Sequence, residues 1–372
     1  MKALKSCLRQ EPVLCASALC ALLSFFFLPP SRETLSFPDY RVLSLLFCLM
    51  ASVAGLGEAG LMRLLSGALL RRARTQRMLA LLMTLLCFFS SMLMTNDVSL
   101  VAFVPLTILV LTQAGLSRLL IPVIALETAA ANLGSALTPV GNPQNLYLFS
   151  AYEMGAGEFF AVTVPLTLAS LLLIVAAVFA LRLRGPLRVA PAEPAAPDRR
   201  RLLLHGALFA LCLLTVFSVL DYRILLGAVL LALLLFDRPV LRKVDYALLG
   251  TFLCFFLFSG NLSRIPAVRD LLTGLMERSA FFASLLTSQV ISNVPAALLL
   301  APFTDDARAM ILGTDVGGLG TLVASLASLI SYKFYARTEG ARPGRYLGFF
   351  TLLNLALLVP LIALSLLLLA VG

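Results

Sequence analysis

Long apolar runs separated by short polar or charged breaks make up almost the whole chain. A helix needs about 20 predominantly apolar residues to cross a bilayer, and most of these runs approach that length. The uninterrupted runs predict seven membrane spans, which are Pro12–Leu28, Val42–Gly57, Phe159–Leu181, Leu202–Leu220, Ile224–Phe236, Tyr246–Ser259 and Tyr346–Val371.

Two further apolar segments carry a polar tip between two arms. Residues 78–112 form the first hairpin, with the tip Thr95-Asn96-Asp97, and residues 279–303 form the second, with the tip Ser292-Asn293. The charge pattern leaves open whether the arms are full spans or re-entrant, because both return the chain to the side that it entered.

Two other segments predict single spans that are broken near the middle. Residues 119–150 are interrupted by Asn, Gly and Pro, and residues 309–331 are interrupted by glycines. With these broken spans the prediction is nine full spans and two hairpins.

The interruptions recur in the same order in two halves, 1–181 and 202–372, on either side of a Pro-, Ala- and Arg-rich linker over 182–201. The clearest match places Asn96 on Asn293, each nine residues before a proline. Two other matches place residues 132–138 on 315–321 and residues 64–67 on 271–274.

Composition and charge refine this architecture. The 372 residues are 60% hydrophobic and 13% charged, which excludes a water-soluble fold and a disordered chain. The net charge of +10 is explained by Lys and Arg in cytoplasmic loops, not by nucleic-acid binding. With the N-terminus and linker cytoplasmic and the C-terminus periplasmic, basic residues favour the inside by roughly three to one. The first hairpin then enters from the cytoplasm and the second from outside, so the halves are inverted.

Inverted repeats with broken helices are typical of secondary transporters whose site lies near the bilayer midplane. A broken helix leaves backbone groups unpaired, and these are tolerated only where protein, water or ligand reaches them. Glycine permits bending and close approach, and proline ends helices. The predicted substrate- or ion-binding residues are Thr95, Asn96, Asp97, Asn132, Gly134, Ser135, Thr138, Pro139, Gly141, Asn142, Asn145, Ser292, Asn293, Pro295, Asp315, Gly317, Gly318 and Thr321.

Asp97 and Asp315 are the two acids at these interruptions, and both depart from the repeat. Asp97 aligns with Val294, whereas Asp315 aligns with Asn132. A carboxylate inside a membrane is costly and marks an ion or proton site by default. The alternative for Asp97 is an exposed turn between two full spans.

Other polar residues have weaker claims to function. Glu127 precedes the first break, where it is either a proton carrier or a partner for a buried polar group. Glu58 and Arg63 fall on a segment, 58–70, that predicts an interfacial helix. His205, the only histidine, is expected to be a solvated interface residue beside the linker. The cysteines form no C-x-x-C pair, so they are expected to pack as small apolar residues.

The interrupted segments resemble a known family. T-N-D-V-S-L-V-A-F-V-P, A-N-L-G-S-A-L-T-P-V-G-N-P-Q-N and S-N-V-P-A are similar to the arsenite permease and Na+/H+ antiporter branch of the ion transporter superfamily. That branch includes small inner-membrane anion transporters and citrate-transporter-like permeases, and the divalent anion–sodium symporters are distant relatives. The resemblance implies re-entrant hairpins, discontinuous helices, an elevator mechanism and a homodimer. The symporters carry Ser-Asn-Thr at both tips, so the tips here disfavour a sodium–dicarboxylate mechanism.

The sequence therefore predicts an all-α polytopic membrane protein with two inverted repeats. Its expected function is secondary active transport of a small anion, arsenite-like oxyacid or cation across the inner membrane, coupled to H+ or Na+ and needing no other cofactor. A passive channel and a membrane-embedded enzyme acting on lipid phosphate are the alternatives. One histidine outside the breaks and no acidic cluster argue against the enzyme.

Overall fold

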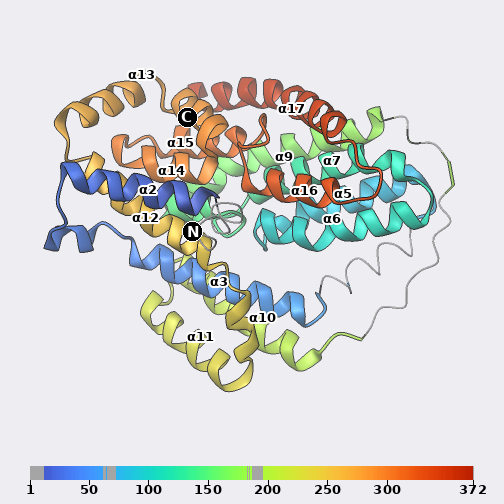
Figure 1. Ribbon diagram of the computed structural model, residues 1–372, viewed down its shortest axis with the longest axis horizontal. Coiled ribbons are helices and arrows are strands. Elements are labelled where there is room, and N and C mark those ends of the chain that lie inside the picture. The colour runs from blue at the N-terminus through green and yellow to red at the C-terminus, as the bar shows by residue number, and fades with distance from the viewer. Residues whose placement is uncertain are drawn as a thin grey trace, which may run out of the picture.

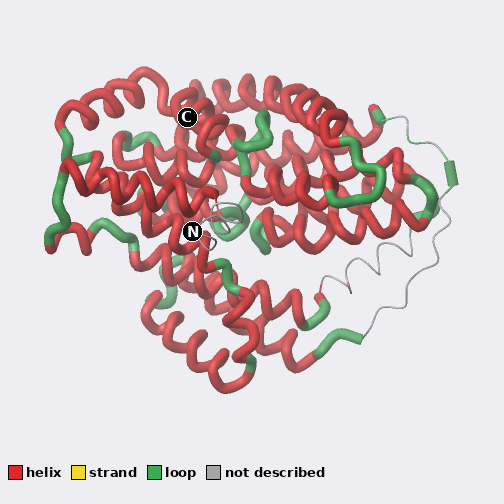
Figure 2. The backbone as a smooth tube through the Cα atoms, viewed as in Figure 1, coloured by secondary structure: helices red, strands yellow, loops and turns green. Residues whose placement is uncertain are grey.

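The computed structural model describes residues 12–61, 64, 73–181, 183, 185–186 and 196–371. Within these ranges the regular elements are helices, apart from one isolated bridge between Thr75 and Pro186 (Figure 2). The prediction of an all-α chain is confirmed for this part. The basic N-terminal tail, Arg63, most of the expected interfacial helix and most of the linker lie outside it.

The helices of the first half follow the predicted segments closely. They are α2 (Pro12–Phe27), η1 (Arg32–Ser36), α3 (Tyr40–Glu58), α5 (Gln76–Ser91), α6 (Asn96–Gln113), η2 (Ser117–Leu119), α7 (Leu120–Ser135), α8 (Pro143–Ala151) and α9 (Ala156–Ala180). The first hairpin is therefore α5–α6, and the first broken helix is α7–α8.

In the second half a hairpin, a broken helix and a final long helix follow one another in the same order as in the first half. They are α10 (Arg199–Val216), α11 (Tyr222–Phe236), η3 (Arg238–Lys243), α12 (Tyr246–Leu262), α13 (Pro266–Ile291), α14 (Asn293–Leu300), η4 (Ala301–Phe303), α15 (Ala307–Gly317), α16 (Leu326–Ala336) and α17 (Pro343–Val371). The second hairpin is the end of α13 with α14, and the second broken helix is α15–α16.

Several helix starts are set by a short polar side chain that accepts a hydrogen bond from a backbone N–H of the first turn. These capping residues are Asp39, Asn142, Asp198, Asp221, Asp245 and Asp306. The cap at Asp198 corrects the predicted linker boundary, because α10 already includes Arg199 and the two arginines that follow.

The second hairpin has its tip at the predicted position. α14 begins directly at Asn293, so this tip residue is already the first residue of the helix. α13 extends back to Pro266, and non-helical backbone interrupts it at Ser279, where φ is −171° and ψ is 99°. This interruption coincides with residue 279, the predicted start of the hairpin, whereas the helical segment before it was not predicted. α12 and α13 meet at an angle of 104°, so the chain turns sharply before the hairpin.

By length and composition, four described helices can cross a membrane: α3, α6, α9 and α17. A fifth is added if the bent pair α12–α13 is one span. α2, α5, α11 and α14 are apolar but shorter. The multi-pass character is thus supported, while the count of nine spans stays a prediction.

Two layers are visible in Figure 1. The helices α3, α10 and α11 pack together at the bottom of the view. The hairpins and broken helices lie in the remainder together with α2, α9, α12 and α17, and there α5 packs on α7 and α13 on α15. Two further pairings join the halves, because α6 packs on α16 and α14 on α8.

Candidate functional site

The two hairpin tips are held in the same manner. The backbone N–H of Asn96 donates to the Gly141 carbonyl at 3.1 Å, and that of Asn293 donates to the Ala324 carbonyl at 3.0 Å. The Oδ1 atom of each asparagine also accepts from the next backbone N–H, at 3.0 Å in both tips. Each tip is therefore fixed to the helix break that follows it in the chain.

Glycine allows the first arm of each hairpin to lie directly against a broken helix. A Cβ atom added to Gly134 would lie 2.1 Å from the Phe88 carbonyl oxygen. One added to Gly317 would lie 2.9 Å from Ser288 Cβ. Neither position has room for a side chain unless the hairpin arm moves away from the broken helix. The close packing of arm and broken helix places each hairpin tip beside a helix break.

Asp315, near the end of α15, is bonded by the beginning of α8 from the other half. Asn145 Nδ2 donates to Oδ2 at 2.9 Å, Asn142 Nδ2 donates to Oδ1 at 3.3 Å, and Gln144 Nε2 lies 3.5 Å from Oδ1. The side chain of Asp315 is 2% exposed. A carboxylate is favoured at a helix N-terminus, where the helix dipole and the amide donors both stabilise negative charge.

Asn132, near the end of α7, has the corresponding contacts with the beginning of α16. Its Oδ1 accepts from Ser325 Oγ at 3.0 Å and from Asn96 Nδ2 at 2.9 Å. Its Nδ2 donates to Ser328 Oγ at 3.4 Å. In the register that aligns Asn132 with Asp315, Ser325 corresponds to Asn142 and Ser328 to Asn145.

One hydrogen-bonded network therefore runs through both halves. Ser135 links the two sets, because its Oγ donates to the Asn132 carbonyl at 2.8 Å and accepts from Asn142 Nδ2 at 3.2 Å. The network is buried in an apolar helical bundle and joins a hairpin tip to both helix breaks.

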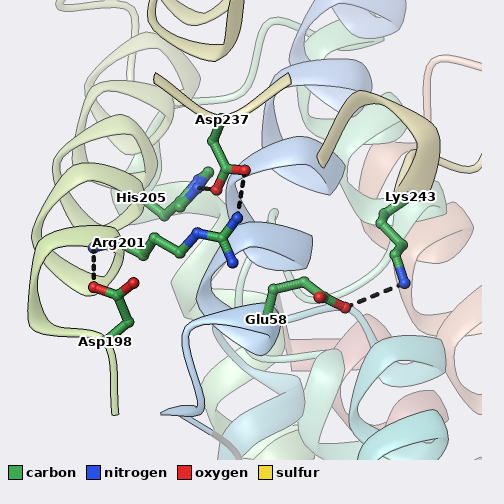
Figure 3. Close-up of polar contacts among 6 residues, drawn as sticks. All are labelled: Glu58, Asp198, Arg201, His205, Asp237 and Lys243. Atoms are coloured by element: carbon green, nitrogen blue, oxygen red, sulfur yellow. Dashed lines mark hydrogen bonds and ion pairs between the residues drawn. The ribbon is translucent and has the colours of Figure 1, made fainter. Parts of the chain in front are cut away.

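A cavity of about 100 Å³ lies beside this network and is lined by Thr95, Asp97, Asn142, Lys243 and Asp245 together with apolar side chains of α3, α8 and α12. A water molecule needs roughly 10–15 Å³ of such space, so the cavity can hold a small ion with part of its hydration shell. Lys243 lines it while pairing with Glu58, at 3.2 Å between Nζ and Oε1 (Figure 3).

Three buried acceptor atoms, one at the cavity and two in the first turn of α8, have no hydrogen-bond partner. They are Asp97 Oδ1, Gln144 Oε1 and Asn145 Oδ1. A buried acceptor without a donor is costly, so such atoms suit a cation or a hydroxylated solute that supplies donors.

A comparison with known proteins bears on the function of this site. Residues 10–310 match the citrate transporter (CitMHS) family. The chain belongs to this family. The match confirms the resemblance to the ion transporter superfamily and identifies a multi-pass membrane transporter.

Some relatives align with most of this member of the citrate transporter family and others with about a third of it. The "Uncharacterized transporter MJ0456" of Methanocaldococcus jannaschii is 30% identical over 331 residues, which cover 88% of this chain and 90% of the relative. The inner membrane protein YbiR of Escherichia coli is 31% identical over 320 residues, 84% of each chain. The silicon efflux transporter LSI3 of Oryza sativa subsp. japonica is 29% identical over 133 residues, 36% of this chain and 27% of the relative.

The predicted site residues divide into three groups in this transporter. Those in the hydrogen-bonded network are Asn96, Asn132, Ser135, Asn142, Asn145 and Asp315. Those around the cavity are Thr95 and Asp97. Those that shape the tips and breaks are Gly134, Thr138, Pro139, Gly141, Ser292, Asn293, Pro295, Gly317, Gly318 and Thr321.

Members of the last group make backbone contacts. Thr138 donates to the Met92 carbonyl beside the first tip. Ser292 adopts a positive φ of 78° at the second tip, and its Oγ lies 3.4 Å from the Ala324 carbonyl. Thr321 is exposed and donates to the Gln289 carbonyl at 3.0 Å, so it lies at the rim of the break.

Asp97 and Asp315, the two acids at the predicted interruptions, do not line the same cavity. Asp97 lines the cavity, whereas Asp315 does not and is reached from it through Asn142. Asp97 is half-buried, with Oδ1 enclosed and unpartnered, which does not fit a fully exposed turn.

Six polar residues of the site were not among the predictions: Gln144, Lys243, Asp245, Gln289, Ser325 and Ser328. Extending the repeat register from Asn142 and Asn145 would have found the two serines. Gln144 stands in the G-N-P-Q-N motif. Gln289 had no sequence signal, but its Nε2 donates to the carbonyls of Gly317 and Leu319 at 2.7 and 2.8 Å and so holds the second break open.

The expectation for His205 was wrong. Its side chain is fully buried between α10 and α3, and Nε2 lies 3.1 Å from Asp237 Oδ2 (Figure 3). Arg201 binds the other oxygen of Asp237 at 2.8 Å. The ring fits because a Cβ on Gly55 would lie 2.1 Å from it. This cluster ties the end of α11 to α10 at a distance in sequence from the transport network.

Proposed function

We propose that the protein is a secondary active transporter of the inner membrane that moves a small ion or oxyacid in exchange or symport with H+ or Na+. The observation that carries the proposal is the reciprocal pairing of the halves. Asp315 binds the start of α8, and Asn132 binds the start of α16. A site built twice from inverted elements can open to either side by equivalent movements, which is the basis of alternating access.

The proposed topology is nine full spans with two re-entrant hairpins in two inverted repeats, 1–181 and 202–372. It is supported by the matched packing of α5 on α7 and α13 on α15, and by the matched tip contacts of Asn96 and Asn293. The layer of α3, α10 and α11 is suited to a scaffold, and the hairpins and broken helices to a moving unit. An elevator movement in a homodimer is part of the proposal.

The chemistry of the site supports a cation or a neutral hydroxylated oxyacid more than a multiply charged anion. The unpartnered buried atoms are acceptors, two acids line the cavity, and its one lysine is engaged by Glu58. A citrate-like trianion would need donors or basic groups at these positions. The acceptors are suited to the coupling cation or to the hydroxyl groups of the solute.

Proteoliposomes loaded with the purified protein test this function. Uptake of arsenite, sodium, sulfate, dicarboxylates and citrate is measured with an imposed pH or sodium gradient and without one. Accumulation of one solute against its own gradient, abolished by collapsing the driving gradient, is the expected result. Flux of a solute that only follows its own gradient would instead identify a passive channel.

A further inference from the structure

Glu127 is a buried carboxyl group that the proposed site does not use. It lies in the middle of α7 with no exposed surface. Thr107 of α6 donates its hydroxyl proton to Oε1. Oε2 is equally buried and has no hydrogen-bond partner.

The surroundings of Glu127 supply no positive charge. None of the ion pairs among the described residues involves it. The titratable groups near it are Cys87 from α5 and Tyr346 from α17, both fully buried and both close enough to act on it electrostatically. Tyr335 of α16 stacks on Tyr346 at 4.9 Å between ring centroids. The other charged residues of the helices packed on α7 lie near helix ends: Arg77 of α5, Asp97 of α6, Glu158 of α9, Arg308 and Asp315 of α15, Lys333 of α16 and Arg345 of α17. Of these, Glu158, Lys333 and Arg345 are exposed.

The fold itself does not require an acid at this position. In the register that pairs Asn132 with Asp315, Glu127 corresponds to Met310, which is also fully buried. An apolar side chain therefore satisfies the equivalent place in the second half.

We propose that Glu127 is a proton-binding site, separate from the cavity at Asp97, which takes up and releases a proton on Oε2 as the transporter works. With Oε1 occupied by the Thr107 hydroxyl, Oε2 either carries an unpaired charge in an apolar core or holds a proton. The first is strongly disfavoured in a membrane. The Tyr346 hydroxyl lies close enough to Glu127 to act on it electrostatically and can exchange hydrogen bonds with it.

A proton fits this site better than a metal ion. Na+ and divalent cations require several oxygen ligands, whereas the hydrogen bonds of the described residues bring one other side-chain oxygen, that of Thr107, to the Glu127 carboxyl group. Because α7 also carries Asn132 and α6 carries Asn96, a change of charge between these two helices can alter how the first hairpin sits on the network.

The role in a transport cycle rests on the proposed function, but proton binding itself can be measured without a substrate. Infrared difference spectra of the full-length protein in lipid nanodiscs are recorded as the pH is raised from mildly acidic to mildly alkaline. The proton is the probe. We expect the wild type to lose one buried carboxylic-acid C=O band, which is absent in Glu127→Gln and shifted in frequency in Thr107→Val. Asp315→Asn, the matched control, should leave this band unchanged.

Three results would overturn the proposal. One is a Glu127 band with constant intensity at every pH, which means a fixed structural proton. Another is a Glu127→Gln spectrum identical to that of the wild type. The third applies if Glu127→Gln does not fold: the titrating band then has the same frequency in Thr107→Val as in the wild type. If Glu127 titrates but the protein transports no solute, the proposed function is refuted and proton binding by Glu127 is not.

Discussion

Asn145 Nδ2 donates a hydrogen bond to Asp315 Oδ2 at 2.9 Å, although the two residues lie in different halves of the chain. The bond joins the first turn of α8 to the last turn of α15, so the two broken helices meet at their breaks. A rearrangement of one half relative to the other must either break this contact or carry it along. The hydrogen bonds of Asp315 therefore depend on how the two halves are placed relative to each other.

We expect Asn145→Ala to lower the free energy of unfolding by roughly 1.5–3 kcal/mol, the range for a hydrogen bond to a charged group. Asn145→Ser should lose less, because a serine, Ser328, fills the equivalent place in the other half. The chain has no tryptophan, so unfolding is best followed through reaction of a thiol-specific dye with buried Cys48 and Cys87. Equal loss in the Ala and Ser variants would contradict the equivalence.

Asp315→Asn should separate exchange from accumulation. The amide keeps the shape and one of the two accepting oxygens but cannot carry charge, so solute exchange is expected to persist while gradient-driven uptake is lost. Flux in proteoliposomes measures both. Asp305→Asn, at an exposed position before α15, is the matched control and should behave as wild type. Unchanged dependence on the proton and sodium gradients in Asp315→Asn would remove this residue from the coupling site.

Gly134→Ala should destabilise the first hairpin by roughly 1–3 kcal/mol, because the new methyl group meets the Phe88 carbonyl of α5 and a backbone atom cannot rotate away. Gly227→Ala on α11 is the control, since a Cβ there has no neighbour within 4 Å. The comparison uses unfolding temperatures in the same detergent. If both variants are equally stable, the close packing of α5 on α7 is not required.

Asp237→Asn should lower stability by about 1–3 kcal/mol, because it removes the charge that binds Arg201 and leaves buried His205 with a weaker partner. Glu58→Gln removes an exposed pair with Lys243, and the expected loss is below about 1 kcal/mol. Thermal unfolding of the purified variants distinguishes the two. An effect of Glu58→Gln as large as that of Asp237→Asn would show that burial does not set the difference.

The topology makes a separate prediction. A reporter fused at Pro194, in the linker, should be active on the cytoplasmic side, and one at Gly372 on the periplasmic side, because basic residues concentrate near the first position. Paired fusions to a cytoplasmic and a periplasmic reporter measure both positions. Signals from the same side would contradict the nine-span arrangement.

Most of the secondary structure could be predicted from the sequence, because a bilayer restricts the backbone conformations that a spanning segment can adopt. Apolar runs must form helices that satisfy their own backbone, so polar residues inside them mark the places where a helix ends. This reasoning located the tips at Asn96 and Asn293 and both helix breaks before Pro143 and Leu326. It also began the second hairpin at residue 279, where α13 bends, but it did not predict the helical segment of α13 that precedes the bend, which depends on how α13 leaves α12.

The candidate residues were predicted as a set, but their pairing was decided by the tertiary structure. No local pattern indicates that Asp315 meets Asn145, or that Gln289 holds the break at Gly317, because these contacts join segments that are distant in the chain or lie on different elements. The same reason explains the error at His205. Its neighbours in sequence include arginines and suggest solvent, whereas its neighbours in space are Gly55 and Asp237.

The sequence by itself determined the class of protein, its helices and the positions of its interruptions, because hydrophobicity and helix-breaking residues act locally along the chain. The tertiary structure decided which polar groups are satisfied and which are left as free acceptors, such as Asp97 Oδ1 and Glu127 Oε2. Burial and hydrogen bonding are properties of what surrounds an atom. For these carboxylates the surroundings come from other helices, brought there only by the packing of the two halves.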